Sequence, residues 1–188
     1  QRSLVGSEMC IRDRNYIIDI NIQDRFFVEE FTSILLRKIL TPFTTGFVDL
    51  QSPSGIINSV IVYNYDGYVY ASDESRMLAE YNDYTFKLGH VTDRYESIFY
   101  GRKAQQIALI WGTEFITGCA DCAFQSYCGA DPVRNYSAQN DMYGFRPTSS
   151  LCKKHKAIIT YLFYLIQNEH DRVMPIFKQW INRNENEF

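Results

Sequence analysis

The strongest constraint on this 188-residue chain is the spacing of four of its five cysteines. Cys119, Cys122 and Cys128 follow the pattern C-x2-C-x5-C, and Cys152 comes after a further twenty-three residues. Four thiolates in such a pattern select soft metal sites, so the sequence predicts either a tetrahedral zinc or a [4Fe–4S] cluster. A zinc ribbon usually has two CxxC pairs, and the single pair here favours iron and sulfur. Four unconnected buried thiols are the remaining interpretation, but the glycines and polar residues around them are typical of a loop.

Composition indicates a folded chain and excludes several classes of protein. Hydrophobic residues make up 46% and aromatic residues 15%, which is too apolar for intrinsic disorder. The net charge is -3 and no basic stripe is visible, so we expect no nucleic-acid partner. No apolar run is long enough to span a bilayer and no signal sequence is visible, so we expect a cytoplasmic protein without a membrane partner. An odd number of cysteines grouped in this way suits a metal site in a reducing compartment.

The N-terminal segment 3–14 matches the translation of a common transposase sequencing adapter. Leu4 to Asp13 agree with the adapter codon by codon over ten consecutive residues. The alternative is a natural polar arm, but a match of this length favours an artefact that is to be left out of fold reasoning. Cys10 then leaves the cysteine count, natural sequence begins near Asn15, and we expect a C-terminal fragment of a longer protein.

Hydrophobic periodicity and turn residues predict a mixed α+β fold. Ser59–Tyr63 and Tyr68–Tyr70 flank Asn64-Tyr65-Asp66-Gly67, whose Asp-Gly pair favours a β-hairpin turn with positive φ. The stretch 119–152 reads as loop-rich. The remaining expectations are strands over 16–22 and 47–50, a loop over 51–55, and helices from Asp24 to near Pro42, from Ser72 or Asp73 through Leu78, from Asp93 through Phe99, over 103–115, over 153–166, and from Pro175 through Trp180.

The cysteine-rich stretch carries a family resemblance. Residues 119–131, Cys-Ala-Asp-Cys-Ala-Phe-Gln-Ser-Tyr-Cys-Gly-Ala-Asp, resemble the SPASM region of radical S-adenosylmethionine peptide-modifying enzymes, which is likewise preceded by a hairpin. More narrowly, 128–136, 141–148 and 152–156 resemble the radical SAM maturase of the His-Xaa-Ser peptide system. The resemblance covers most of 43–168. It implies an α+β, SPASM-like auxiliary cluster domain, in which a β-hairpin is followed by helices and a cysteine-rich loop region, with a remnant strand and helix of a partial α/β barrel.

In that family a full SPASM region has seven cysteines that serve two auxiliary clusters. The resemblance implies that one complete set is kept here, the four ligands of the outer [4Fe–4S] cluster: Cys119, Cys122, Cys128 and Cys152. It also implies that the inner cluster is absent, since its cysteine positions are held by Ser52 or Ser54, Ser72 and Pro132. The loss of one whole set and the retention of the other favour iron–sulfur over zinc.

The resemblance also implies a function. Radical chemistry in this family starts at an N-terminal barrel whose C-x3-C-x2-C loop holds a second [4Fe–4S] cluster and S-adenosylmethionine, and this chain has no such motif. We expect an accessory, non-catalytic part of an enzyme that modifies a ribosomally synthesised precursor peptide. Its expected partners are that peptide, the missing barrel and a partner maturase. The alternative is a zinc-stapled peptide- or protein-binding module without enzymatic activity.

The expected organisation is an adapter-derived segment over 1–14, a barrel remnant over 15–50, a SPASM-like iron–sulfur domain over 51–168 and a C-terminal helix over 169–188. We expect the remnant to leave an exposed apolar face on Phe26, Phe27, Phe31 and Leu35.

Two polar residues near these motifs have competing interpretations. His155 follows Cys152 by three residues and is a candidate ligand or hydrogen-bond donor, although a solvent-facing histidine at a helix start is the expected role. Asp73 occupies a place where relatives that resemble this chain can carry an acid serving as a base, although an N-cap is the expected role. The hairpin tyrosines suit either a peptide-docking edge or ordinary cross-strand packing, and cross-strand packing is the simpler explanation.

Overall fold

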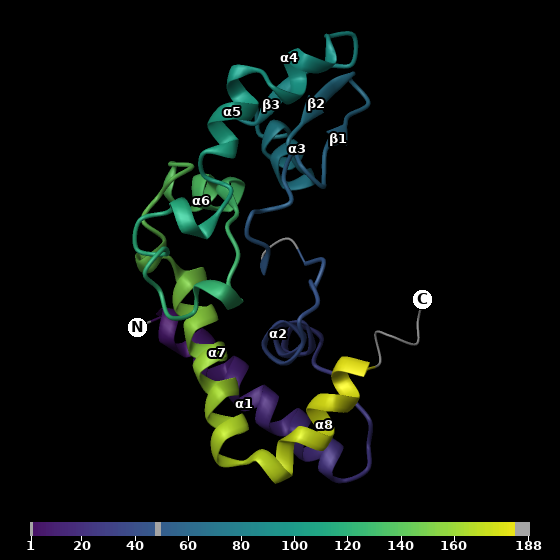
Figure 1. Ribbon diagram of the computed structural model, residues 1–188, viewed down its shortest axis with the longest axis vertical. Coiled ribbons are helices and arrows are strands. Elements are labelled where there is room, and N and C mark those ends of the chain that lie inside the picture. Colours follow the sequence, from purple (N-terminus) through teal and green to yellow (C-terminus); the bar gives the residue numbers. More distant parts are fainter. Residues whose placement is uncertain (1, 48–49, 183–188) are drawn as a thin grey trace. The chain divides into compact units, whose positions relative to one another are not determined.

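The computed structural model describes residues 2–47 and 50–182, with side chains from residue 11 onward (Figure 1). The chain divides into two compact units. The first, which we call the helical unit, combines the segment up to Phe47 with the segment from Pro147 onward. The second, the sheet unit, is the middle of the chain up to Arg146. Each unit is described by itself.

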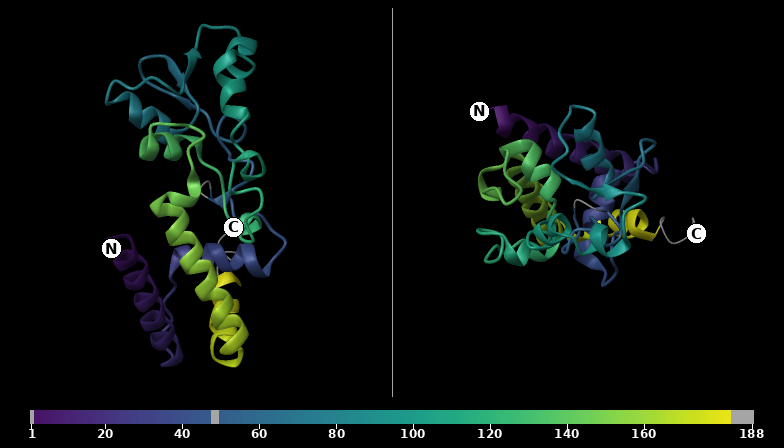
Figure 2. Two further views of the ribbon diagram at one scale, coloured as in Figure 1. Left: turned by 90° about the vertical axis from the view of Figure 1, so that its left-hand side faces the viewer. Right: turned by 90° about the horizontal axis from the view of Figure 1, so that it is seen from above.

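The helical unit consists of four helices that pack on one another (Figures 1 and 2). They are α1 (Arg2–Ile22), α2 (Glu30–Leu40), α7 (Ser150–Asn168) and α8 (His170–Asn182). Helix α1 packs against α7 and α8, and α2 packs against α8. Their apolar stripes form the core, whose fully buried members include Ile18, Leu35, Leu36, Ile158, Ile159, Leu162, Val173, Phe177 and Trp180.

The sheet unit holds a three-stranded antiparallel sheet in the order β1-β2-β3, with short helices around it (Figure 1). The strands are β1 (Val62–Tyr63), β2 (Tyr68–Tyr70) and β3 (Lys87–His90). The helices are α3 (Asp73–Ala79), α4 (Tyr95–Phe99), α5 (Arg102–Ala108) and α6 (Pro132–Gln139), with 3-10 turns η2 (Thr113–Phe115) and η3 (Gln125–Tyr127). A further 3-10 turn, η4 (Arg146–Thr148), begins at the last residue of this unit. One core cluster joins the sheet to α5 and α6 through Ile56, Ala71, Phe86, Ile107 and Val133.

The predicted hairpin is confirmed. Val62 pairs with Tyr70 and Tyr63 with Val69, and the Asn64 amide donates to the Tyr68 carbonyl at 2.9 Å. Gly67 has a φ of +80°, the left-handed conformation that the Asp-Gly pair predicts. The predicted loop over 51–55 is confirmed as well.

The predicted strand over 16–22 is wrong, because this segment is the last part of helix α1. Its isoleucines suit a strand locally, but no neighbouring strand is available within the helical unit as described. A helix satisfies its own backbone hydrogen bonds, and Ile18 is then only 1% exposed in the helical core. Packing therefore overrides the local preference.

Helix α2 begins later than predicted. Asp24 does not cap it; this residue has a φ of +59° at the end of α1. The N-cap is Glu29, whose carboxylate accepts a 2.8 Å hydrogen bond from the Thr32 amide. Phe26 and Phe27 therefore precede the helix and are exposed as expected, at 57% and 56%. The expected exposure of Leu35 is wrong, since this residue lies fully inside the core.

Several other elements differ from the predictions in their bounds or in their kind. The predicted helix over 103–115 ends at Ala108 and gives way to η2, and α8 begins five residues before Pro175, which lies inside it. The turn at 95–99 is helical as predicted, but its N-cap is Arg94 and the Asp93 carboxylate instead accepts from the His90 amide. The loop-rich stretch contains an unpredicted helix, α6. The predicted strand over 47–50 falls largely on 48–49, outside the described residues.

Within the described ranges, no helix combines the length and the apolar character that a membrane crossing requires.

Candidate metal centre

The first two cysteines lie in a tight turn of the sheet unit. Gly118 precedes them in the left-handed region with a φ of +76°, and the Cys119 amide donates to the Ile116 carbonyl at 3.0 Å. The Cys122 amide then donates to the Cys119 carbonyl, also at 3.0 Å. This i to i+3 hydrogen bond closes a β-turn, which keeps the two residues of the CxxC pair close along the backbone.

The backbone after Cys128 is held by buried contacts. Its amide donates to the Gln125 carbonyl at 3.1 Å, which closes the η3 turn. Arg146 is 3% exposed and its guanidinium donates to the Gly129 carbonyl. Asp131 then caps α6 by accepting from the first amides of that helix. The segment that follows the third cysteine is therefore fixed from both sides, although the sequence alone reads it as an open loop.

Cys152 belongs to the helical unit. It lies in the first turn of α7, where the Ser149 hydroxyl accepts a 3.1 Å hydrogen bond from its amide. All four cysteines are half-buried.

The donor set fits a metal centre in kind and number, because four thiolates complete a zinc site or a [4Fe–4S] cluster. Across residues 2–47 and 50–182, however, no three His, Cys, Asp or Glu side chains are gathered so that they could hold a metal ion. Three of the cysteines belong to the sheet unit and the fourth to the helical unit. Their assignment as ligands therefore stays a prediction.

The first of the three positions that the resemblance assigns to an absent inner cluster is Ser52 or Ser54, and both serines lie in a hydroxyl-rich loop. The Ser52 hydroxyl donates to a Glu114 carboxylate oxygen at 2.8 Å and lies 2.9 Å from the Thr113 hydroxyl. The pKa of Glu114 is held below its ordinary value by a hydrogen bond from its own amide and by the Ser52 hydroxyl. Ser54 is fully buried, and no hydrogen-bond partner of its hydroxyl is described.

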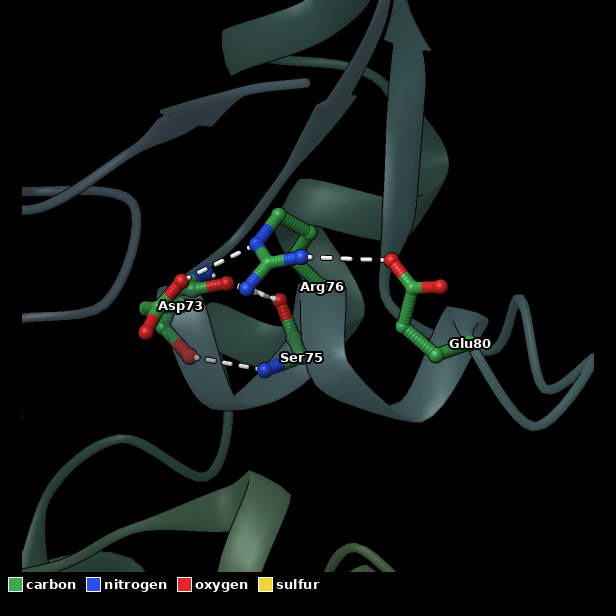
Figure 3. Close-up of polar contacts among 5 residues, drawn as sticks. Asp73, Ser75, Arg76 and Glu80 are labelled. Atoms are coloured by element: carbon green, nitrogen blue, oxygen red, sulfur yellow. Dashed lines mark hydrogen bonds and ion pairs between the residues drawn. The ribbon is translucent and has the colours of Figure 1, made fainter. Parts of the chain in front are cut away.

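The other two positions begin helices. Ser72 is the N-cap of α3 and forms a capping box with Ser75, in which the side chain of each serine accepts a hydrogen bond from the backbone amide of the other (Figure 3). Pro132 is the first residue of α6, where the missing amide hydrogen has no cost. Both residues thus have roles in folding that require no metal.

Asp73 is not an N-cap, so the expected role is wrong. Its carboxylate is 63% exposed and pairs with the Arg76 Nε at 3.0 Å (Figure 3). Arg76 also pairs with Glu80 at 3.3 Å, one turn further along α3. The acid at position 73 is therefore an accessible carboxylate beside a guanidinium.

His155 is buried rather than solvent-facing, which contradicts the expectation for it. The side chain is 3% exposed, and its ring centre lies 5.6 Å from that of Phe31 on α2. It lies one turn after Cys152 on α7, and it precedes the buried Ile158 and Ile159 at helical spacing. That apolar spacing is the sequence signal that could have predicted its burial.

Comparisons with known proteins identify solved structures with a similar fold. No protein-family model and no curated protein matches the chain. Among solved structures, hexahistidine-tagged anSMEcpe with bound AdoMet superposes with a TM-score of 0.61 at 15% identity, over 95% of this chain and 44% of that one. Native anSMEcpe with bound AdoMet and a Kp18Cys peptide gives 0.59 at 16% identity, over 89% and 43%. The chain has the fold of part of this enzyme.

The neighbour anSMEcpe is an anaerobic sulfatase-maturating radical SAM enzyme of the SPASM type. The expected likeness in fold to a radical SAM/SPASM maturase is thereby confirmed. The chain spans less than half the length of the solved anSMEcpe chains that it matches. Its likeness to the His-Xaa-Ser system and the adapter origin of residues 3–14 stay predictions.

Proposed function

We propose that this chain is the C-terminal auxiliary-cluster part of a radical SAM maturase that modifies a ribosomally synthesised precursor peptide, of the kind found in the His-Xaa-Ser system. The observation that carries the proposal is a combination. A chain with the fold of part of a radical SAM enzyme keeps all four cysteines of one predicted cluster set while lacking the other set. Random loss of cysteines is a poor explanation, because it would have removed members of both sets.

In this proposal Cys119, Cys122, Cys128 and Cys152 each bind one iron of a [4Fe–4S] cluster. Such a cluster supplies one-electron transfer when it is bound, and four protein thiolates leave no iron open for substrate. The chain's own residues fix parts of the backbone that carries these cysteines. Arg146 fixes the backbone after the third cysteine, and the first turn of α7 presents the fourth at its positive end.

The irregular backbone around the first three cysteines is compatible with this role. Thiolate sites in loops usually take their final geometry from the metal, because a preformed site is rare without it. The proposal therefore requires that the thiolates close on the cluster when it is inserted.

The proposal also assigns cofactors, domains, a substrate class and a location to the parent enzyme. S-adenosylmethionine and a second [4Fe–4S] cluster belong to the N-terminal barrel of the parent, with residues 15–50 as its remnant, 51–168 as the cluster domain and 169–188 as the closing helix. A peptide bound to anSMEcpe supports a peptide as the substrate class. We place the parent in the cytoplasm, where thiolate clusters are kept reduced.

The deciding experiment is anaerobic reconstitution of the full chain with iron and sulfide. We expect about four iron and four sulfide atoms per chain, with the broad visible absorption of thiolate-to-iron charge transfer. Cys119→Ser, Cys122→Ser, Cys128→Ser and Cys152→Ser should each reduce the iron that survives gel filtration. Cys10→Ser is the matched control and should retain it fully.

Two outcomes contradict the proposal. One colourless zinc ion per chain, lost in the same four variants, would identify the zinc-stapled binding module instead. A chain that retains neither metal after reconstitution would show that the four cysteines are not ligands.

A further inference from the structure

A pocket with a volume of about 330 Å³ lies in the sheet unit where α6 ends. That volume is at the lower end of the roughly 300–1,000 Å³ of pockets that hold small ligands. The lining comes from α5, from α6 and from the segment after α6, and every member of it is exposed or half-buried: Gln106, Tyr136, Asn140, Asp141, Met142 and Tyr143.

The segment after α6 is folded back onto that helix. The buried Asn135 side chain donates to the carbonyls of Met142 and Tyr143, each at 3.4 Å. The side-chain amide of Gln139, at the end of α6, donates to the Phe145 carbonyl at 3.2 Å and accepts from the Phe145 amide at 2.7 Å. These contacts fix the backbone that carries most of the lining, so the pocket is formed before a ligand binds.

Two aromatic rings and a thioether make up the apolar part of the lining. The Tyr136 ring packs edge-on against Phe86, with ring centres 5.5 Å apart, and its hydroxyl lies 3.1 Å from that of Thr85. Met142 packs against the core cluster of the sheet unit, and Tyr143 is 52% exposed. Aromatic faces attract cations and also cover the aliphatic stems of long basic side chains.

The polar part of the lining is electrically negative. Among the described residues that line the pocket, only Asp141 is charged. Its carboxylate accepts a 2.9 Å hydrogen bond from the Tyr143 amide, and no described basic side chain pairs with it. Helix α6 has no basic residue in its last turn, so the partial negative charge at that end is not offset by its own side chains. The side-chain amides of Gln106 and Asn140 add two oxygens that can accept hydrogen bonds.

We propose that this pocket binds an arginine side chain of the precursor peptide. The guanidinium charge complements Asp141 and the end of α6. Its flat face stacks on a tyrosine ring, and its spread N–H donors match acceptors on several side chains better than a compact ammonium does. An acidic side chain would meet Asp141, and a purely apolar one would desolvate the carboxylate without pairing it. The inference rests on the proposed function, which supplies a peptide as the substrate.

The test is an NMR titration of the isotope-labelled full chain with the blocked peptide acetyl-Gly-Gly-Arg-Gly-Gly-amide. The Tyr143 amide is the reporter, because it donates to Asp141. We expect its signal to shift saturably. A peptide with citrulline, which has the shape of arginine without its charge, should bind about fivefold more weakly, as the loss of one exposed ion pair does. A lysine peptide should fall between the two, because it keeps the charge but not the flat face.

A matched pair of variants makes the test specific. Asp141→Asn removes the charge but keeps an oxygen for the Tyr143 amide, and it should weaken the arginine peptide about fivefold without affecting the citrulline peptide. Asp66→Asn is the control, since the exposed Asp66 carboxylate likewise accepts from the amide two residues on, that of Tyr68, at 3.0 Å, and lies outside the pocket. It should alter neither peptide.

Three outcomes would overturn the assignment: equal effects of the two substitutions, equal binding of the arginine and citrulline peptides, or no saturable shift. A Tyr143 signal that moves with protein concentration in the absence of peptide would show that a second copy fills the pocket, which also overturns the peptide assignment.

Iron content is measured on the same samples, so that this inference and the proposed function can fail separately. A chain that retains iron but binds no arginine peptide contradicts the pocket alone. A chain that binds the arginine peptide without retaining iron supports the pocket and contradicts the proposed function.

Discussion

At the scale of single residues, the hairpin depends on Gly67. Its φ of +80° is costly for any residue with a Cβ, and an added Cβ would run into the His90 imidazole of the neighbouring strand. His90 is held there by a 2.8 Å contact between its Nδ1 and the Thr92 hydroxyl. The turn therefore combines a backbone requirement with a steric one.

We expect Gly67→Ala to lower the free energy of unfolding by about 2 kcal/mol, measured by urea denaturation. Gly46→Ala is the control, since Gly46 also has a positive φ but no atom within 4 Å of an added Cβ. It should cost only the backbone strain, about 1 kcal/mol. Gly67→Ala combined with His90→Ala should recover part of the difference; no recovery would mean that the imidazole is not the obstacle.

The carboxylate of Asp83 links the start of β3 to α6 and should make stability depend on acid. It accepts a 3.0 Å hydrogen bond from the Thr85 amide, and the Thr85 hydroxyl lies 3.1 Å from the Tyr136 hydroxyl. Desolvation alone would raise the pKa of Asp83, but the hydrogen bonds from Thr85 and Tyr136 together hold it below its ordinary 3.8. The folded state therefore prefers the ionised form.

Because the folded pKa is depressed, the stabilisation by Asp83 is fully present above the unfolded pKa and is lost as the pH falls through the folded pKa. We expect the urea midpoint of the chain to drop as the pH is lowered from about 5 to below 3.8, and the drop to be smaller in Asp83→Asn. Glu96→Gln, which alters an exposed carboxylate, should leave the pH dependence as it is. Identical pH profiles for Asp83→Asn and the unaltered chain would contradict this role.

At the scale of elements, α1 and α2 are joined by a buried ion pair. The Arg14 side chain is 5% exposed, and its Nε lies 3.1 Å from a Glu29 carboxylate oxygen and 2.5 Å from the Thr32 hydroxyl. Glu29 also caps α2, so one carboxylate serves both the helix start and the contact between helices. Removing the guanidinium would leave that carboxylate partly buried without its counter-charge.

Arg14→Met should therefore lower the free energy of unfolding by about 2 kcal/mol, less than for a fully buried pair because Glu29 is 24% exposed. Arg12→Met provides the comparison. Arg12 is 74% exposed and pairs only with the adjacent Asp13 in the described contacts, so its loss should stay within about 0.5 kcal/mol. Equal urea midpoints for the two variants would contradict a stabilising ion pair between Arg14 and Glu29.

Elements whose structure is decided locally could be predicted from the sequence, and those decided by packing could not. The Asp-Gly turn is predictable, because its residues themselves carry the required geometry. The start of α3 is predictable only to within one residue, since Ser72 and Asp73 are both good N-caps and the structure uses Ser72. The isoleucines of α1 predict a strand, because over so short a segment the helical and the strand periodicity of apolar residues look alike. Only the packing of α1 against other helices distinguishes them. The sequence does not predict helix α6, because this helix is short and follows a cysteine-rich loop whose glycines and prolines suggest irregular backbone throughout.

At the scale of the whole molecule, the proposed ligand set draws on both units. Cys152 belongs to the helical unit and the other three cysteines to the sheet unit, so a cluster bound by all four would be lost when either unit unfolds. Each unit also contains one of the two tryptophans, Trp180 in the helical unit and Trp111 in the sheet unit. Single-tryptophan variants can therefore report the unfolding of each unit separately.

We expect the reconstituted chain to unfold in urea with one midpoint, whether fluorescence is read from Trp111→Phe or from Trp180→Phe. After the iron is removed with a chelator and an oxidant, the two midpoints should separate, because nothing covalent beyond the chain then couples the units. Comparing each variant with and without iron cancels the cost of the tryptophan substitution itself. Reconstituted Cys152→Ser should behave like the stripped chain, since its loss leaves all remaining ligands in one unit. Midpoints that are unchanged by iron would mean that the cluster does not join the two units.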